Sequence, residues 1–212
     1  MKFIETIKNV WKIEELKNRI LITLGLLLVY RFGTQVVLPG IDASQLSNLA
    51  SQTDDGLLGL LNAFTGGAFS NASIFALGIM PYISASIVVQ LMGIAVPYLQ
   101  KLQKEGESGR KKINQITRWL TIAITLVQGP GYIYNLYGTL PQSAFLLGDS
   151  ISFVVSSVII LTTGCIFAMW LGERITDKGI GNGISLLIMV GIIARLPQSV
   201  YQEFVSRVSG AD

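Results

Sequence analysis

The glycine-rich run from Lys178 to Ser185, KGIGNGIS, is the stretch of this sequence whose spacing first suggests chemistry. Loops that bind phosphate surround the anion with backbone N–H groups, but they follow a β-strand, and the nucleotide-binding form ends in Gly-Lys-Ser/Thr. This run follows an apolar helical stretch and lacks that ending. We therefore expect a tight loop with several positive-φ positions, followed by a helix whose first amides are satisfied by Asn182 or Ser185.

Other residue types that carry chemistry are absent or isolated. The sequence has no histidine, which excludes histidine-based catalysis and histidine metal sites, and its single cysteine, Cys165, cannot form an internal disulfide. No Asp, Glu or Lys lies deep in an apolar stretch. Carriers coupled to protons or ions normally need such groups. The sequence therefore predicts no enzyme, no metal and no cofactor.

The apolar stretches carry isoleucine stripes and two uncharged amides. Ile79, Ile83 and Ile87 recur every four residues, as do Ile188 and Ile192. Such stripes usually pack in a core, but a ring of isoleucines can also form a constriction that excludes water by dewetting. Gln90 and Gln128 either bond weakly across helices, at roughly 1 kcal/mol or less each, or make one local contact.

Composition defines the elements that must position these residues. Half of the chain is hydrophobic and only 14% is charged, with a mean hydropathy of +0.55, whereas soluble domains carry about 25% charged residues. We predict an all-α, polytopic membrane helix bundle with five transmembrane helices at residues 20–38, 72–96, 119–137, 151–172 and 184–205. Pro81 should kink the second span, and Gly129-Pro130-Gly131 should interrupt the third.

Two segments are predicted not to span. Residues 1–19 are expected to form a cytoplasmic amphipathic helix at the membrane surface, or else a basic flank that orients the first span. Residues 56–69 are too short to cross and are broken by Gly66 and Gly67. They predict either a re-entrant or plugging helix, or an ordinary loop helix on the outer surface. Arg31 is either a functional charge within the membrane or, as the nearby Pro39-Gly40 favours, a side chain that extends to the outer interface.

The basic residues predict the orientation. Thirteen of the sixteen lie in residues 1–19, 98–118 and 173–183, and none lies between Arg31 and Lys101. The last two of these segments are expected to be soluble loops. By the positive-inside rule all three segments face the cytoplasm and Asp212 lies outside, provided that residues 56–69 do not cross. An odd number of spans is also what one of two inverted halves would have.

Long motifs in this sequence resemble the SecY family, the central subunits of the bacterial protein-conducting channel. They are NAFTGGAFSNASIFALGIMPYISASIVVQL, KEGESGRKKI and GERITDKGIGNGIS, together with VYRFGTQVVLPGID in the first span. The resemblance covers essentially the whole chain, in order. It implies that residues 1–212 form the N-terminal half of an inverted-repeat ten-helix channel, of which only the first five spans are matched.

The resemblance also implies roles for individual residues. A plug helix would cover residues 56–69 and include Leu57, Leu58, Leu60, Leu61, Asn62, Phe64, Gly66 and Gly67. This half of the hydrophobic pore ring would comprise Ile79, Ile83, Ile188 and Ile192. One side of the lateral gate, through which apolar segments leave for the lipid, would include Ser84, Ile87, Gln90 and Gln128.

The implied function is to move unfolded secretory proteins across the bacterial cytoplasmic (inner) membrane and to insert membrane proteins into it, with the N-terminus in the cytoplasm. The implied partners are the SecE and SecG subunits, the SecA motor ATPase, the ribosome, signal sequences and nascent polypeptides, membrane lipids and the C-terminal half of SecY. Half of a small-solute carrier is the alternative, with Gly129-Pro130-Gly131 as its only candidate for an unwound site. An intramembrane hydrolase is disfavoured by the missing histidine.

Overall fold

The computed structural model describes residues 12–46, 56–146 and 150–209, and these residues are helical or irregular, without a β-strand. The predicted all-α class is therefore confirmed for this part of the chain. Most of the predicted helix over residues 1–19 lies outside it. The elements are α2 (Glu14–Gly33), η1 (Ala43–Gln45), α4 (Gly56–Phe64), α5 (Met80–Ala95), α6 (Pro97–Lys104), α7 (Glu107–Thr139), η2 (Gln142–Ala144), α8 (Ile151–Lys178) and α9 (Gly183–Ser209).

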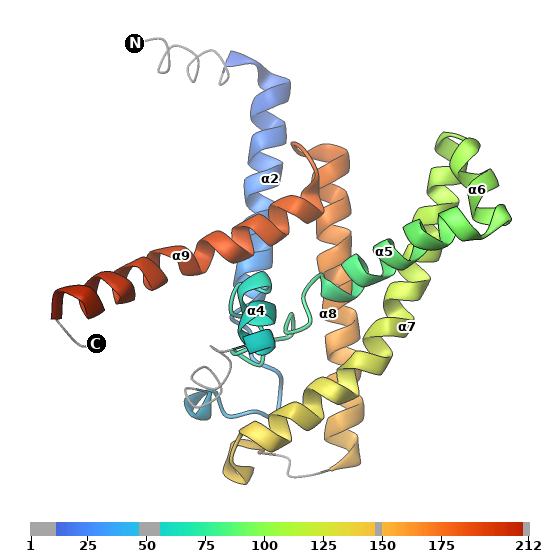
Figure 1. The fold of residues 1–212 in the computed structure, drawn as a ribbon. Helices are drawn as coiled ribbons and strands as arrows, with labels where there is room; N and C mark the ends of the chain where they lie inside the picture. The colour runs from blue at the N-terminus through green and yellow to red at the C-terminus, as the bar shows by residue number, and fades with distance from the viewer. Residues whose placement is uncertain (1–11, 47–55, 147–149, 210–212) are drawn as a thin grey trace.

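Helix α8 is the centre of the packing. It contacts α2, α5, α7 and α9, while α7 also packs against α5 and α6. Figure 1 shows α2 and α8 running side by side, with the short α4 near the middle of the view and α9 crossing in front of α2 before it leaves the body. Helix α5 leaves the body on the opposite side. The two arms therefore diverge from a common centre.

Only α8, among the helices of the described residues, is both long enough and apolar enough to cross a membrane by itself. Helices α5 and α6 together reach that standard, but they meet at an angle of 100°. Helix α9 contributes a shorter apolar stretch, Gly183–Ala194. The other predicted spans overlap α2, α5, α7 and α9, so helices occur where they were expected, but the count of five spans stays a prediction.

The predicted kink at Pro81 is wrong. Helix α5 begins at Met80, so Pro81 lies in its first turn, where no intrahelical partner exists for a backbone N–H. Gly78, with φ +52°, lies two residues before this start. Residues 72–79 form turns rather than the first part of a helix. The proline therefore helps to start α5 instead of bending it.

Two predicted soluble loops are largely helical. Helix α7 begins at Glu107 and α6 covers Pro97–Lys104, so most of residues 98–118 is helix, and α8 continues through residues 173–178. The predicted break at Gly129-Pro130-Gly131 is also wrong, because α7 passes through Pro130. A Cβ on Gly129 would lie 3.3 Å from the Val158 side chain, so the missing side chain lets α7 approach α8.

The predicted tight loop follows α8 and comprises residues 179–182. The expectation of several positive-φ positions is wrong, because Gly181, with a φ of +71°, is the one residue of this loop with a positive φ. Asn182 Oδ1 accepts hydrogen bonds from the N–H groups of Ile184 and Ser185, at 3.1 and 3.3 Å. This confirms the predicted Asn182 cap of α9.

At another turn, the backbone and hydroxyl groups of Ser44 donate to Asp42 and lower the pKa of its carboxyl group.

Two hydrophobic clusters meet at the irregular segment 69–79. One cluster joins this segment to α7, α8 and the loops beside η1 and η2, and the other joins it to α2, α8 and α9. Ile74 packs against both clusters. Helix α2 ends at Gly33, before the predicted limit at Leu38, and a Cβ on Gly33 would lie 2.1 Å from the Phe75 ring. The segment that follows α4 is thus the junction of the two cores.

Candidate functional site

The short apolar segment predicted as a plug contains the helix α4, Gly56–Phe64. A helix of nine residues is too short to cross a bilayer. Helix α4 packs against α9, and Asn62 at its end is completely buried. Among the predicted plug residues, Leu57, Leu58 and Leu60 lie on this helix, but their side chains are outside the described part of the structure.

Hydrogen bonds fix the chain as it leaves α4. Asn62 Oδ1 accepts from the N–H of Ser70 at 3.1 Å, and the carbonyl of Asn62 accepts from the N–H of Gly67 at 2.9 Å. The Thr65 hydroxyl donates to the carbonyl of Asn62 and accepts from the N–H of Phe69. Residues 65–70 are all buried. The predicted plug residues Gly66 and Gly67 therefore lie in a packed, hydrogen-bonded turn.

Gly66 and Gly67 have φ values of +65° and +90°, which side chains rarely permit. A Cβ on Gly66 would lie 2.8 Å from the Cα of Gly191 on α9, and a Cβ on Gly191 would lie 2.8 Å from the carbonyl oxygen of Phe64. The backbones of the plug segment and α9 are thus in direct contact. Sequence reasoning missed Gly191, because its partner is far away along the chain.

Arg31, in the last turn of α2, contacts the same glycine. Its NH1 group donates to the carbonyl of Gly66 at 3.0 Å. The predicted extension of Arg31 to the outer interface stays a prediction. The local sequence did not indicate this hydrogen bond, because the acceptor comes from a segment 35 residues further along the chain.

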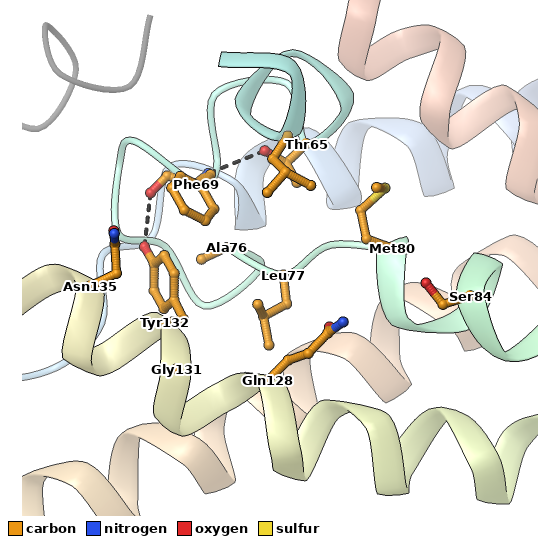
Figure 2. A pocket seen from close by; sticks show the side chains of 11 residues that line it. Thr65, Phe69, Ala76, Leu77, Met80, Ser84, Gln128, Gly131, Tyr132 and Asn135 are labelled. Atoms are coloured by element: carbon orange, nitrogen blue, oxygen red, sulfur yellow. Dashed lines mark hydrogen bonds between the residues drawn. The ribbon is translucent and has the colours of Figure 1, made fainter. Parts of the chain in front are cut away.

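A cavity of about 490 Å³ lies between the plug segment and the two predicted gate helices, α5 and α7 (Figure 2). The plug segment contributes Leu61, Thr65 and Phe69, and α7 contributes Gln128, Gly131, Tyr132 and Asn135. The lining is completed by Ala76, Leu77, Met80 and Ser84. Tyr132 donates its hydroxyl hydrogen to the carbonyl of Phe69 at 2.8 Å, which ties the plug segment to α7. The walls are mostly apolar, with a few polar groups.

The structure brings together two of the four predicted gate residues. Ser84 and Gln128 both border this cavity, from α5 and α7. Ile87 and Gln90 are exposed further along α5, and Gln90 Nε2 donates to Ser86 Oγ at 3.0 Å, a local contact within one helix. Sequence reasoning missed Asn135, which lies two turns after Gln128 on α7 and also faces the cavity.

The predicted pore-ring residues do not form one cluster in this chain. Ile79 is buried, and Ile83 packs against the same core cluster, which also contains Leu187 from α9. Ile188 and Ile192 instead line a shallow pocket of about 360 Å³ on α9, together with Ser185, Met189 and Ile193. The α5 and α9 parts of the predicted ring are therefore separate surfaces here.

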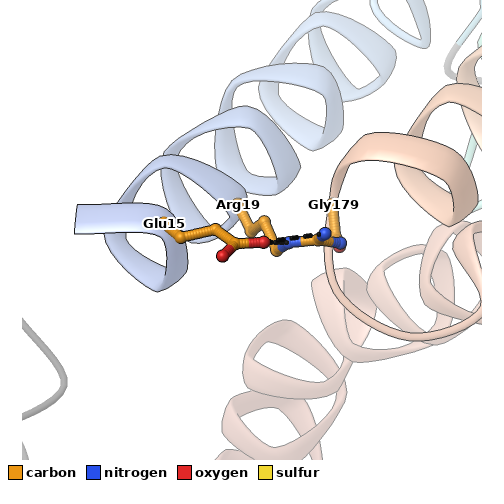
Figure 3. Close-up of polar contacts among 3 residues, drawn as sticks. All are labelled: Glu15, Arg19 and Gly179. Carbon is orange, nitrogen blue, oxygen red and sulfur yellow. Dashed lines mark hydrogen bonds and ion pairs between the residues drawn. The ribbon is translucent and has the colours of Figure 1, made fainter. Parts of the chain in front are cut away.

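The opposite end of the bundle is polar. Arg118 on α7 donates to both carboxylate oxygens of Glu173 on α8, at 2.9 and 2.6 Å. Arg19 of α2 bonds Glu15 and the carbonyl of Gly179, as Figure 3 shows. Thr23 accepts from the N–H of Ile180 at 3.0 Å. The Arg19 and Thr23 bonds join α2 to the loop after α8.

Comparison with known proteins places the chain in a family. The family model described as SecY matches residues 73–210. The chain is 46% identical to the protein translocase subunit SecY of Escherichia coli K12, over 88% of this chain and 42% of that protein. It is 46% identical to the protein translocase subunit SecY of Buchnera aphidicola subsp. Acyrthosiphon kondoi, over 88% of this chain and 52% of that protein. It is 47% identical to the protein translocase subunit SecY of Haemophilus influenzae, over 89% of this chain and 42% of that protein.

The chain thus spans about half the length of the relatives it matches. The matched residues begin within the junction segment 69–79 and include both predicted gate helices and the polar loop before α9. A family match over most of the described residues, together with this identity, is decisive: the chain belongs to the SecY family.

Proposed function

We propose that this chain is the N-terminal half of the central pore-forming subunit of a Sec protein-conducting channel. Such a channel moves unfolded secretory proteins across the membrane and releases apolar segments sideways into the lipid. In this proposal α4 is the plug, and α5 and α7 form one side of the lateral gate. The chain needs no covalent chemistry for this task, and a partner supplies the energy.

The observation that carries the proposal is the cavity between α4, α5 and α7. The plug segment and both gate helices border the same space, so a displacement of either would change that space. Its walls are mostly apolar and include the amides of Gln128 and Asn135. A conduit for chains of every sequence must avoid specific polar contacts. Weak, deformable apolar walls suit that requirement better than a charged binding site does.

The isoleucine surfaces fit the same role. In the proposed channel Ile79 just before α5, Ile83 on α5, and Ile188 and Ile192 on α9 contribute to a ring that excludes water and ions by dewetting. Because these two surfaces diverge within this chain, the remaining ring residues would come from the second half of the channel. Apolar segments that reach the gate would then leave by partition into lipid.

The setting is proposed from the family and from the positive-inside rule. We propose the bacterial cytoplasmic membrane, with the N-terminus in the cytoplasm, since thirteen of sixteen basic residues share one side of a five-span arrangement. The proposed partners are the SecE and SecG subunits, the SecA ATPase, the ribosome, signal sequences, nascent chains, lipids and the C-terminal half of SecY. The name shared by the matched relatives, protein translocase subunit, supports this assignment.

Cross-linking to a stalled secretory chain tests the proposal. The complete gene product that carries these residues is prepared with Cys165→Ala and with single cysteines at Ile83 or Ile188. We expect both cysteines to label the stalled chain. Val127→Cys is the matched control, because this α7 side chain is 79% exposed and does not line the cavity.

The outcomes separate the two classes of transporter. Labelling at Ile83 and Ile188 but not at Val127 supports a conduit for polypeptides. Equal labelling at all three positions would indicate contact without a defined path. Labelling by a small-solute analogue, with none by the stalled chain, would replace the proposal with a solute carrier.

A further inference from the structure

We propose that Arg31 is a positioning residue that latches the plug segment in its sealed position, with Gly191 as the second part of the latch. This inference rests on the proposed channel function and deepens it. Arg31 holds the carbonyl of Gly66 from α2, and Gly191 holds the backbone of the same residue from α9. One residue of the plug segment is thus gripped from two helices.

The contact from α2 is a hydrogen bond from a charged donor to a neutral carbonyl. Arg31 is half-buried, and its NH1 group lies 3.0 Å from the oxygen of Gly66. Hydrogen bonds with one charged partner are stronger than neutral ones. A guanidinium group in an apolar region needs such acceptors. If the plug segment moved away, Arg31 would lose this acceptor, so the bond opposes displacement.

The contact between α9 and the plug segment is possible because Gly191 and Gly66 have no side chains. A Cβ on Gly191 would approach the carbonyl oxygen of Phe64 to 2.8 Å and the nitrogen of Gly66 to 3.4 Å. The same carbonyl and amide belong to the turn that ends α4. Any side chain at position 191 would therefore push the turn away from α9.

The two contacts are coupled through the packing of the helices. Helices α2 and α9 contact each other as well as the plug segment, and in Figure 1 α9 crosses α2 close to α4. Separation of α2 from α9 would stretch both contacts on Gly66 at once. The latch therefore predicts that movement between these two helices releases the plug, in addition to any opening between α5 and α7.

Ion leakage through the resting channel tests the latch. The complete gene product, purified with its accompanying subunits, is reconstituted in proteoliposomes, and chloride efflux is measured without a translocating chain. Arg31→Met keeps an apolar side chain of similar length but removes the donor. We expect about a tenfold faster leak, the change in population that follows loss of one charge-assisted hydrogen bond. Arg31→Lys, which keeps a charged donor, should leak less than Arg31→Met.

Arg19→Met is the matched control. It removes an arginine contact to a backbone carbonyl, that of Gly179, from the same helix but at the polar end. We expect its leak to equal that of the unchanged protein. A leak in Arg19→Met as large as that in Arg31→Met would overturn the latch, as would an unchanged leak in Arg31→Met.

A second variant keeps the latch testable if Arg31→Met does not fold. Gly191→Ala should also raise the leak, whereas Gly25→Ala, where a Cβ meets no atom within 4 Å, should not. If Arg31→Met does not accumulate in the membrane, an unchanged leak in Gly191→Ala overturns the latch. Protein transport by the same vesicles separates the two proposals. Absence of transport by the unchanged protein contradicts the channel function, whereas transport with normal leaks in every variant contradicts only the latch.

Discussion

Individual glycines in this chain mark places where two backbones touch. Gly164 on α8 is the clearest case, because a Cβ there would lie 2.1 Å from the carbonyl oxygen of Ile74. Ile74 belongs to the junction segment between the two cores. Backbone cannot yield to an added methyl group as the end of a flexible side chain can. This glycine is therefore required by packing, although the local sequence does not specify Ile74 as its partner.

We expect Gly164→Ala to destabilise the protein by about 1–3 kcal/mol or more, the usual cost of overpacking a filled core. The measurement is the temperature at which the detergent-solubilised protein aggregates. Gly25→Ala is the control, because a Cβ on Gly25 of α2 would meet no atom within 4 Å and alanine favours a helix more than glycine does. Equal melting temperatures for Gly164→Ala and Gly25→Ala would show that α8 and the junction segment are not in close contact.

At the scale of elements, the two prolines of α5 and α7 differ in position and therefore in effect. Pro81 occupies the first turn of α5, where a missing N–H costs nothing. Pro130 lies inside α7, where a backbone donor is lost from the helix. Identical residue types thus have different consequences, and only the helix boundaries distinguish them.

Pro81→Ala should change stability by less than about 1 kcal/mol, since alanine loses only the preset φ of proline at a first-turn position. Pro130→Ala restores a donor inside α7 and should raise the melting temperature. Both are measured by aggregation temperature in the same detergent. A strong loss of stability in Pro81→Ala would mean that residues before Met80 are helical and that the proline bends them.

The whole molecule exposes far more apolar surface than a soluble protein tolerates. Large exposed side chains occur on every long helix, among them Leu28 on α2, Val127 on α7, Ile151 on α8 and Val208 on α9. Exposed apolar side chains in such numbers require a membrane or partner subunits to cover them. This supports a membrane protein, although within the described ranges one helix alone satisfies the length and apolarity of a span.

Membrane insertion tests this surface. Val127→Asp places a charge on a side chain that is 79% exposed, at a cost of about 2.5–3.5 kcal/mol if the position lies at mid-membrane. We expect a marked fall in the fraction that resists alkaline extraction, whereas Val127→Leu should remain in the membrane. Equal resistance of the two variants would place this face of α7 in water or against protein.

Local sequence determined the parts of this molecule that depend on near neighbours. Hydrophobic spacing predicted helices in the regions of α2, α5, α7, α8 and α9, length limited α4 to a non-spanning helix, and Asn182 was recognisable as a cap because its partners lie two and three residues away. The long motifs also predicted the SecY family, which comparison confirmed.

Tertiary structure decided what depends on distant segments. Arg31 finds its acceptor in Gly66, Gly191 meets the turn after α4, and Ser84 meets Gln128 across a cavity, each through a partner that no local pattern specifies. The faces of α5 and α9 were undetermined for the same reason, because an isoleucine stripe packs equally well against protein or around an opening. Helix periodicity is a local property, whereas the position of α9 depends on the close approach of its backbone to α8 at Gly183 and to the plug segment at Gly191.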